Sequence, residues 1–363
     1  MASNTFGNIF KITTWGESHG KAIGVVIDGC PAGLEISDGE INAALALRAP
    51  GRNPYTSPRT ETDKAEILSG VFEGKTTGAP ISIIIPNKDA DSSKYEPIKD
   101  LLRPGHANYT YLEKYGIFDY KGGGRSSARE TACRVAAGAV AMAFLEQHEI
   151  QITAYIKQIG NIEASIDTTD FELLRTSTYL SPVFCPDANA TASMTALIEQ
   201  AKNEGDSLGG VVEFIALAIP TGLGDPVYEK LEANLAKAMM SLPATKGFEM
   251  GSGFRAATMR GSEHNDIFIN KSGKFQTTTN YAGGTLGGIS TGMPIIGRVA
   301  FKPTSSIMKP QETLTTNGEE ASFNLPAGSR HDPCVAIRAV PIVEAMAALV
   351  LTDAILLNRC ARL

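Results

Sequence analysis

Runs of hydrophobic residues predict β-strands in both halves of the chain. In the first half, residues 10–15 and 22–28 are rich in β-branched and aromatic side chains, and residues 80–86 form a nearly continuous apolar run. In the second half, residues 211–219 and 295–301 have the same character. Short apolar runs of this composition are typical of strands that are at least half buried.

Helical periodicity lies between these predicted strands. A helical pattern begins at Ser37, with apolar positions at Ile41, Leu45 and Leu47, and it ends before Pro50-Gly51. Residues 229–242 have one apolar face, whereas residues 128–145 carry small apolar side chains on most faces. A helix that is apolar on most faces belongs in a protein core, so we expect the last segment to be buried.

The most apolar tract, residues 335–357, predicts a second buried helix. It contains Arg338, Glu344 and Asp353, so we expect a core helix rather than a membrane span. Residues 1–10 lack a basic region followed by an apolar stretch, so we expect no signal peptide.

A comparison of the chain with itself suggests an internal duplication. Residues 16–34 align without a gap with residues 205–223, a shift of 189 positions (205 minus 16). The matched pairs are Gly16 and Gly205, Ser18 and Ser207, Gly20 and Gly209, Pro31 and Pro220, Gly33 and Gly222, and Leu34 and Leu223. We expect one domain over residues 1–363, with similar halves at about 6–150 and 200–360. Chance matches of glycine and proline are the alternative.

Composition narrows the class of protein. The 363 residues exceed the usual size of one domain, which predicts several domains or one large elaborated domain. Hydrophobic residues make up 43% and charged residues 20%, which are values of globular proteins. A net charge of −6 without blocks of like charge argues against nucleic acid as a partner, but not against a small anion. The five cysteines lack metal-type spacing, which favours reduced thiols in the cytosol and no metal site.

A glycine-rich segment leads into the first buried helix. Residues 122–130 read GGGRSSARE, and Ser127 and Glu130 have the spacing of a capping box. One interpretation is a well-capped helix after a flexible turn. The other is an anion site, because a helix N-terminus offers free N–H groups, and Arg125 and Arg129 add positive charge.

Histidines occur in three short polar stretches. His19 lies within residues 16–20, His106 ends the sequence RPGH, and His331 belongs to the sequence RHDP. A single histidine is usually structural, but this grouping favours roles in proton transfer. Asp332, before a proline, is also a common turn residue.

Three further segments are candidates for ligand binding. Residues 302–306 read KPTSS and offer one cation and three hydroxyl groups after a strand, although a solvated strand end explains them equally well. Residues 282–288 form a second glycine-rich loop. Arg48, Arg52 and Arg59 lie near the end of the first helix, where they can bind an anion or form surface ion pairs. No GxGxxG follows the first strand, so a Rossmann domain has no support.

Taken together, these motifs resemble those of the chorismate synthase family. Residues 16–20, 123–132 and 330–333 resemble its three signatures, and residues 103–106 and 302–306 resemble further motifs in the same order. The resemblance covers roughly residues 6–357. It implies an α+β fold, a β-α-β sandwich with central helices between antiparallel sheets, assembled as a homotetramer.

The resemblance also implies an activity. Family members are lyases that form chorismate from 5-enolpyruvylshikimate 3-phosphate by an anti 1,4-elimination of phosphate, the last common step of the shikimate pathway to the aromatic amino acids. The reaction depends on reduced FMN although it has no net redox change, and NADPH is a possible reductant. A cytoplasmic location is expected, with neither a membrane nor a nucleic acid as partner.

Residue roles follow from the same resemblance. His19 would act as an acid or electrostatic partner for the leaving phosphate, His106 would protonate or polarise the reduced flavin, and Asp332 would steer a proton at the flavin. The substrate would be held by Arg48, Arg52, Arg129 and Arg330. The FMN site would be lined by Arg125, Ser126, Ser127, Ala244, Gly287, Lys302, Pro303, Thr304, Ser305, Ser306 and Arg330.

One departure from the family pattern concerns Arg52. Many members have an arginine after Pro-Gly and two small polar residues, whereas here Arg52 follows Gly51 directly and Pro54 stands near the expected position. Two rival functions also stay open: an NADPH-dependent flavin reductase, and a protein that binds phosphorylated ligands without catalysis.

Overall fold

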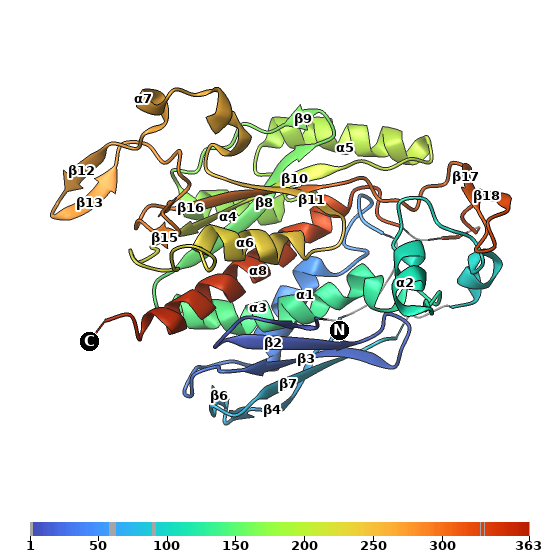
Figure 1. The fold of residues 1–363 in the computed structure, drawn as a ribbon, viewed down its shortest axis with the longest axis horizontal. Coiled ribbons are helices and arrows are strands. Elements are labelled where there is room, and N and C mark those ends of the chain that lie inside the picture. Colours follow the sequence, from blue (N-terminus) through green and yellow to red (C-terminus); the bar gives the residue numbers. More distant parts are fainter. Residues whose placement is uncertain (1–2, 58–62, 89–91, 327, 330, 363) are drawn as a thin grey trace.

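The structure is a computed structural model that describes residues 3–57, 63–88, 92–326, 328–329 and 331–362. Within them, two five-stranded antiparallel sheets enclose a layer of helices (Figure 1). The first sheet has the order β1-β2-β3-β7-β4. Its strands are β1 (Thr5–Phe6), β2 (Lys11–Gly16), β3 (Ala22–Asp28), β4 (Glu66–Ser69) and β7 (Ile81–Pro86).

The second sheet is built from the later part of the chain, in the order β11-β16-β10-β8-β9. Its strands are β8 (Gln151–Ile159), β9 (Ile162–Glu163), β10 (Gly210–Leu217), β11 (Thr245–Met250) and β16 (Ile295–Phe301). In both sheets the central strands alternate buried and more exposed side chains, because one face packs on the helices.

The helical layer consists of α1 (Asp38–Arg48), α3 (Thr131–Glu146), α6 (Leu231–Met240) and α8 (Val335–Asn358). Helices α3 and α8 lie side by side in its centre, as predicted from their small and apolar residues (Figure 1). The backbones approach closely at Gly138, where an added Cβ would lie 2.3 Å from the Cβ of Ala345. The α+β sandwich expected from the sequence is therefore confirmed.

Helix α8 is long and apolar enough to cross a membrane, yet 94% of its most apolar window is buried inside the protein. Its two carboxylates accept hydrogen bonds from segments that lie far from the helix in the sequence. Glu344 accepts hydrogen bonds from the N–H of Ala154 in β8 and from the hydroxyl of Tyr179. Asp353 accepts from the N–H groups of Asn8, Ile9 and Phe10 before β2. The charged residues of this helix thus fix the layer between the sheets.

The two halves share one strand order. The series β2, β3, α1, β4, β7, α3 forms a sheet ordered β2-β3-β7-β4, and the series β8, β10, α6, β11, β16, α8 forms a sheet ordered β8-β10-β16-β11. The shift of 189 positions found in the sequence places β3 on residues 211–217 of β10. We propose that a duplication produced both halves, and this common order supports it.

One local prediction is wrong. Ser127 and Glu130 do not cap α3 as a reciprocal pair, because a 3₁₀ turn (Ala128–Glu130) precedes the helix. The Ser127 hydroxyl accepts from the N–H of Arg129, and Glu130 forms an ion pair with Arg134 at 2.8 Å. By contrast, Ser37 and Glu40 form a capping box at the start of α1.

The other elements surround this sandwich. Helix α4 packs on the outer face of the second sheet, where Phe171 and Leu174 contact Tyr155 and Ile215. The remaining elements are α2 (Asn108–Tyr115), α4 (Phe171–Leu180), α5 (Ala188–Asn203), α7 (Gly261–His264), the 3₁₀ helices Ser93–Ile98, Gly124–Ser126 and Gly253–Thr258, and the hairpins β5 (Val71–Phe72) with β6 (Lys75–Thr76), β12 (Phe268–Lys271) with β13 (Lys274–Thr277), β14 (Thr285–Leu286) with β15 (Ile289–Ser290), and β17 (Gln311–Leu314) with β18 (Glu320–Phe323).

Candidate active site

A cavity of about 390 Å³ lies where α1 ends and where α3 and α8 begin. Many of the sequence-predicted residues line it, although they come from segments far apart in the chain. The predicted residues in its lining are His19, Arg48, His106, Ser126, Ser127, Arg129, Ala244, Lys302, Pro303, Thr304, Ser305, Ser306, His331 and Asp332. The fold therefore brings together all five motifs that were recognised separately in the sequence.

His19 is held at the cavity by contacts with two other segments of the chain. Its Nδ1 lies 2.9 Å from the hydroxyl of Ser92, and its ring meets the edge of Tyr95 at 5.4 Å between centroids. Gly122, at φ +74°, lies so close that an added Cβ would come within 2.1 Å of the His19 ring. Only glycine allows this approach, so the GGG segment positions the histidine.

His106 lies between cations. The RPGH loop is joined to the KPTSS loop, because Lys302 Nζ donates to Gly105 O at 2.6 Å and Arg103 Nη2 donates to Ser306 Oγ at 2.8 Å. Burial, followed by the charges of Arg103, Lys302 and His331, lowers the pKa of His106 to about 3. The imidazole is therefore neutral at pH 7, and it offers one N–H donor and one acceptor.

Two arginines of the cavity share one carboxylate. Arg48 Nη1 donates to Asp63 Oδ2 at 2.8 Å, and Arg129 Nη1 donates to Asp63 Oδ1. Burial, and then the charge of Arg338, lowers the pKa of Arg48 to about 10, whereas Asp63 opposes this shift. The guanidinium group thus stays charged at neutral pH.

Asp332 is held by another arginine of the cavity wall, Arg338. Its Oδ2 accepts from Arg338 Nη1 at 2.8 Å, and its Oδ1 accepts from the N–H of Ser57 at 2.8 Å. Arg338 Nε also donates to the carbonyl oxygen of Arg48 at 3.2 Å. The start of α8 is in this way tied to the end of α1.

Three predicted residues lie outside the lining of the cavity. Arg52 stacks over the ring of Phe184 at 4.3 Å. The loop after α1 is held in that direction because Asn53 Nδ2 donates a hydrogen bond to the carbonyl oxygen of Pro182. Arg125 points to β2 and donates to Thr14 Oγ1 at 2.7 Å. Gly287 forms the turn between β14 and β15. Arg59 and Arg330 are outside the described residues.

The sequence did not indicate several residues that the fold adds to the site. Tyr95 and Arg338 line the cavity, and Asp63 and Asn87 bind its arginines from behind. Arg338 carried one signal, since it is one of the few charged residues of a long and mainly apolar helix and lies near its start. Asp63 and Asn87 follow no motif, so only the fold reveals them.

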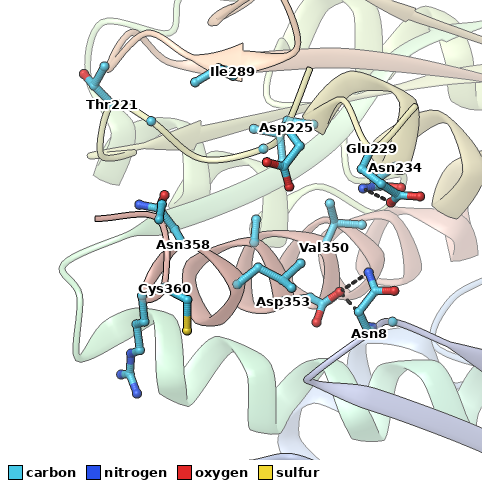
Figure 2. A pocket seen from close by; sticks show the side chains of 18 of the residues that line it. Asn8, Thr221, Asp225, Glu229, Asn234, Ile289, Val350, Asp353, Asn358 and Cys360 are labelled. Atoms are coloured by element: carbon cyan, nitrogen blue, oxygen red, sulfur yellow. Dashed lines mark hydrogen bonds between the residues drawn. The ribbon is translucent and has the colours of Figure 1, made fainter. Parts of the chain in front are cut away.

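Two other cavities put the site in context. One of about 360 Å³ shares Ser306, His331 and Asp332 with it, so the open space extends beyond the first cavity. A larger one of about 1390 Å³ lies at the far end of α8 and contains none of the predicted site residues (Figure 2). The cavity lined by the sequence motifs is therefore not the largest of these three. Among the described residues no cluster of three or more potential metal ligands is present.

Comparisons with known proteins agree with the motifs. A family model described as chorismate synthase matches residues 10–356. The chain is 60% identical to a chorismate synthase of Protochlamydia amoebophila (strain UWE25), with 100% of both chains covered. It is 53% identical to a chorismate synthase of Methanococcoides burtonii, over 97% of this chain and 96% of that relative.

The fold leads to the same family. A crystal structure of chorismate synthase matches with a TM-score of 0.78 and 34% identity, over 97% of this chain and 93% of that chain. Sequence and fold thus agree over almost the whole length, and the chain belongs to the chorismate synthase family.

Proposed function

We propose that this enzyme converts 5-enolpyruvylshikimate 3-phosphate to chorismate by an anti 1,4-elimination of phosphate that depends on reduced FMN. The observation that carries the proposal is the convergence of five separate motifs on one cavity, with His19, His106 and two arginines in its wall. A cavity lined by imidazole and guanidinium groups suits a phosphorylated acid, because it offers fixed positive charge and proton donors.

The residues present fit a flavin. Within the described part of the chain, three buried polar atoms of the cavity wall, His106 Nδ1, Arg103 Nε and Thr304 Oγ1, have no hydrogen-bond partner. Buried polar groups are normally satisfied, so these atoms support a polar ligand beside the RPGH and KPTSS loops. The Lys302 to Ser306 loop, Ser126, Ser127 and Ala244 would hold the flavin.

Ala244 provides a further sign of a built site. Its φ is +68°, a conformation that costs a residue other than glycine free energy. The strained backbone is stabilised where Lys302 N–H donates to Ala244 O at 2.9 Å.

When bound, reduced FMN would supply electron density to the substrate ring as phosphate leaves and recover it afterwards.

The protein's own groups would orient the substrate and move protons. Arg48 and Arg129 would bind its anionic groups, and His19 would stabilise the departing phosphate. His106 is neutral, so it would polarise the flavin through a hydrogen bond rather than as a cation. Asp332, held by Arg338 and Ser57, would keep a fixed acceptor for the proton at the flavin.

The broader setting is also proposed. We infer a cytoplasmic homotetramer, in keeping with the reduced cysteines expected from the sequence and with exposed apolar side chains such as Phe268 and Phe275 on the projecting hairpin β12–β13 (Figure 1). NADPH stays a possible reductant. Nothing in the described cavity identifies a dinucleotide site.

An anaerobic phosphate-release assay tests the proposal. Phosphate should be released from 5-enolpyruvylshikimate 3-phosphate only when reduced FMN is present, and chorismate should form in equal amount. Consumption of NADPH without substrate and without phosphate release would instead identify a flavin reductase. Tight flavin binding with neither reaction would identify a binding protein.

A further inference from the structure

Asp63 is the residue at which two arginines of the cavity meet. Its side chain is fully buried, and those of Arg48 and Arg129 are 3% and 4% exposed. Both arginines line the cavity, whereas Asp63 lies behind them. The carboxylate therefore contacts the binding groups without reaching the ligand space itself.

Each guanidinium group is also held from another direction. Arg48 donates from Nε to Thr131 Oγ1 at 3.1 Å and from Nη2 to Ala128 O at 2.9 Å. Arg129 donates from Nε to Asn87 Oδ1 at 2.9 Å. With these contacts in place, the two oxygens of one carboxylate set the separation and the tilt of both groups.

The Asn87 amide extends this arrangement to His19. Its Nδ2 donates to Glu17 O at 3.0 Å and to Gly20 O at 2.9 Å, on either side of the histidine. Asp63, Arg129 and Asn87 thus form a continuous series of hydrogen bonds from the end of α1 to the His19 loop. A change at Asp63 would therefore alter the position of Arg129 and, through Asn87, that of the His19 loop.

We infer that Asp63 is a positioning residue, which orients Arg48 and Arg129 so that they bind one anionic ligand together. The inference rests on the proposed function only for the identity of that ligand. The inference also predicts in which direction the affinity for an anion changes when Asp63 loses its charge. Asp63 is negative, so by Coulomb's law alone its neutralisation would tighten anion binding, whereas loss of orientation would weaken it.

The Asp63→Asn variant tests this, since it keeps the size of the side chain and removes its charge. Inorganic phosphate binding is measured by thermal shift on the full-length protein, FMN binding by flavin fluorescence, and KM and kcat by the anaerobic assay. We expect phosphate affinity to fall about tenfold or more and KM to rise to a similar extent, because a directed charge-assisted contact is lost. FMN affinity should change less than about threefold.

Asp353→Asn is the matched control. Asp353 is also a buried carboxylate with several N–H donors, but it lies at the far end of α8 beside the large cavity (Figure 2). This variant should lower the melting temperature and leave phosphate affinity unchanged. Asp63→Glu, which keeps the charge, should recover part of the affinity, and it replaces the asparagine variant if that one does not fold.

Unchanged or tighter phosphate binding by Asp63→Asn would overturn the inference, as would equal losses of phosphate affinity in Asp63→Asn and Asp353→Asn. Phosphate binding needs no turnover. If the wild-type protein binds phosphate but does not catalyse phosphate release from the substrate, the proposed function is wrong. The role of Asp63 in phosphate binding is still tested by the variants in that case.

Discussion

At the scale of single residues, the site depends on positions where one side chain decides what its neighbour can do. Gly122 is such a position, because its missing Cβ leaves room for His19. The backbone there has φ +74°, which L-residues adopt only at a cost. Both the contact with His19 and the positive φ therefore disfavour any residue other than glycine at position 122.

We expect Gly122→Ala to reduce turnover by about a hundredfold or more, the usual contribution of a positioned acid, because the new Cβ would displace His19. FMN binding should persist. Gly74→Ala is the control, since Gly74 has φ +77° but open space around its Cβ position. Steady-state kinetics of both variants would separate displacement of His19 from backbone strain, and equal kinetics would contradict the prediction.

His106 gives a pH dependence whose sign follows from its environment. The folded protein holds its pKa at about 3, below the ordinary value of 6.5, so the unfolded chain binds more protons between these values. The contribution of His106 to the unfolding free energy is therefore kept above pH 6.5, and it is lost as the pH decreases toward 3.

Between pH 6.5 and pH 5, the wild type should lose about 1.5 kcal/mol more unfolding free energy than the His106→Gln variant. Urea denaturation at the two pH values measures the difference. Parallel losses in the two proteins would show that His106 is protonated in the folded state as readily as in the unfolded state.

At the scale of elements, packing overrides intrinsic preference. Alanine is favoured over glycine inside a helix by about 1 kcal/mol. At Gly138 of α3, however, a Cβ would lie 2.3 Å from the Cβ and 2.7 Å from the Cα of Ala345 in α8. The helices would have to separate.

Gly138→Ala should therefore destabilise the protein by about 1–3 kcal/mol, the usual cost of overpacking a core, despite the better helix former. Chemical denaturation measures this. A rise in stability would mean that α3 and α8 have room to move apart.

At the scale of the whole molecule, two halves of equal strand order enclose one helical layer, but they carry different chemistry. The loop before β3 contains His19, and its counterpart before β10 contains Leu208. The site lies at one end of this layer, where α1 ends and where α3 and α8 begin. Both α3 and α8 direct the positive ends of their dipoles toward that end, which favours an anionic ligand.

Much of this was visible in the sequence. The boundaries of β3 and β16 and the burial of α8 follow from hydrophobic spacing, because a strand or helix repeats its buried face at a fixed local period. His19, His106 and the KPTSS loop were found as motifs, because glycine, proline and charged residues mark loops locally. Resemblance to the family then implied that these motifs form one site, and it implied their roles.

Only the tertiary structure decided which side chains share a space. Arg52 and Arg125 look like ligand-binding arginines in the sequence, yet Phe184 and Thr14 draw them away from the cavity. Asp63 has no motif, yet it joins Arg48 to Arg129. The physical reason is that the direction of a long charged side chain depends on partners remote in sequence, and these partners become neighbours only when the sheets close on the helices.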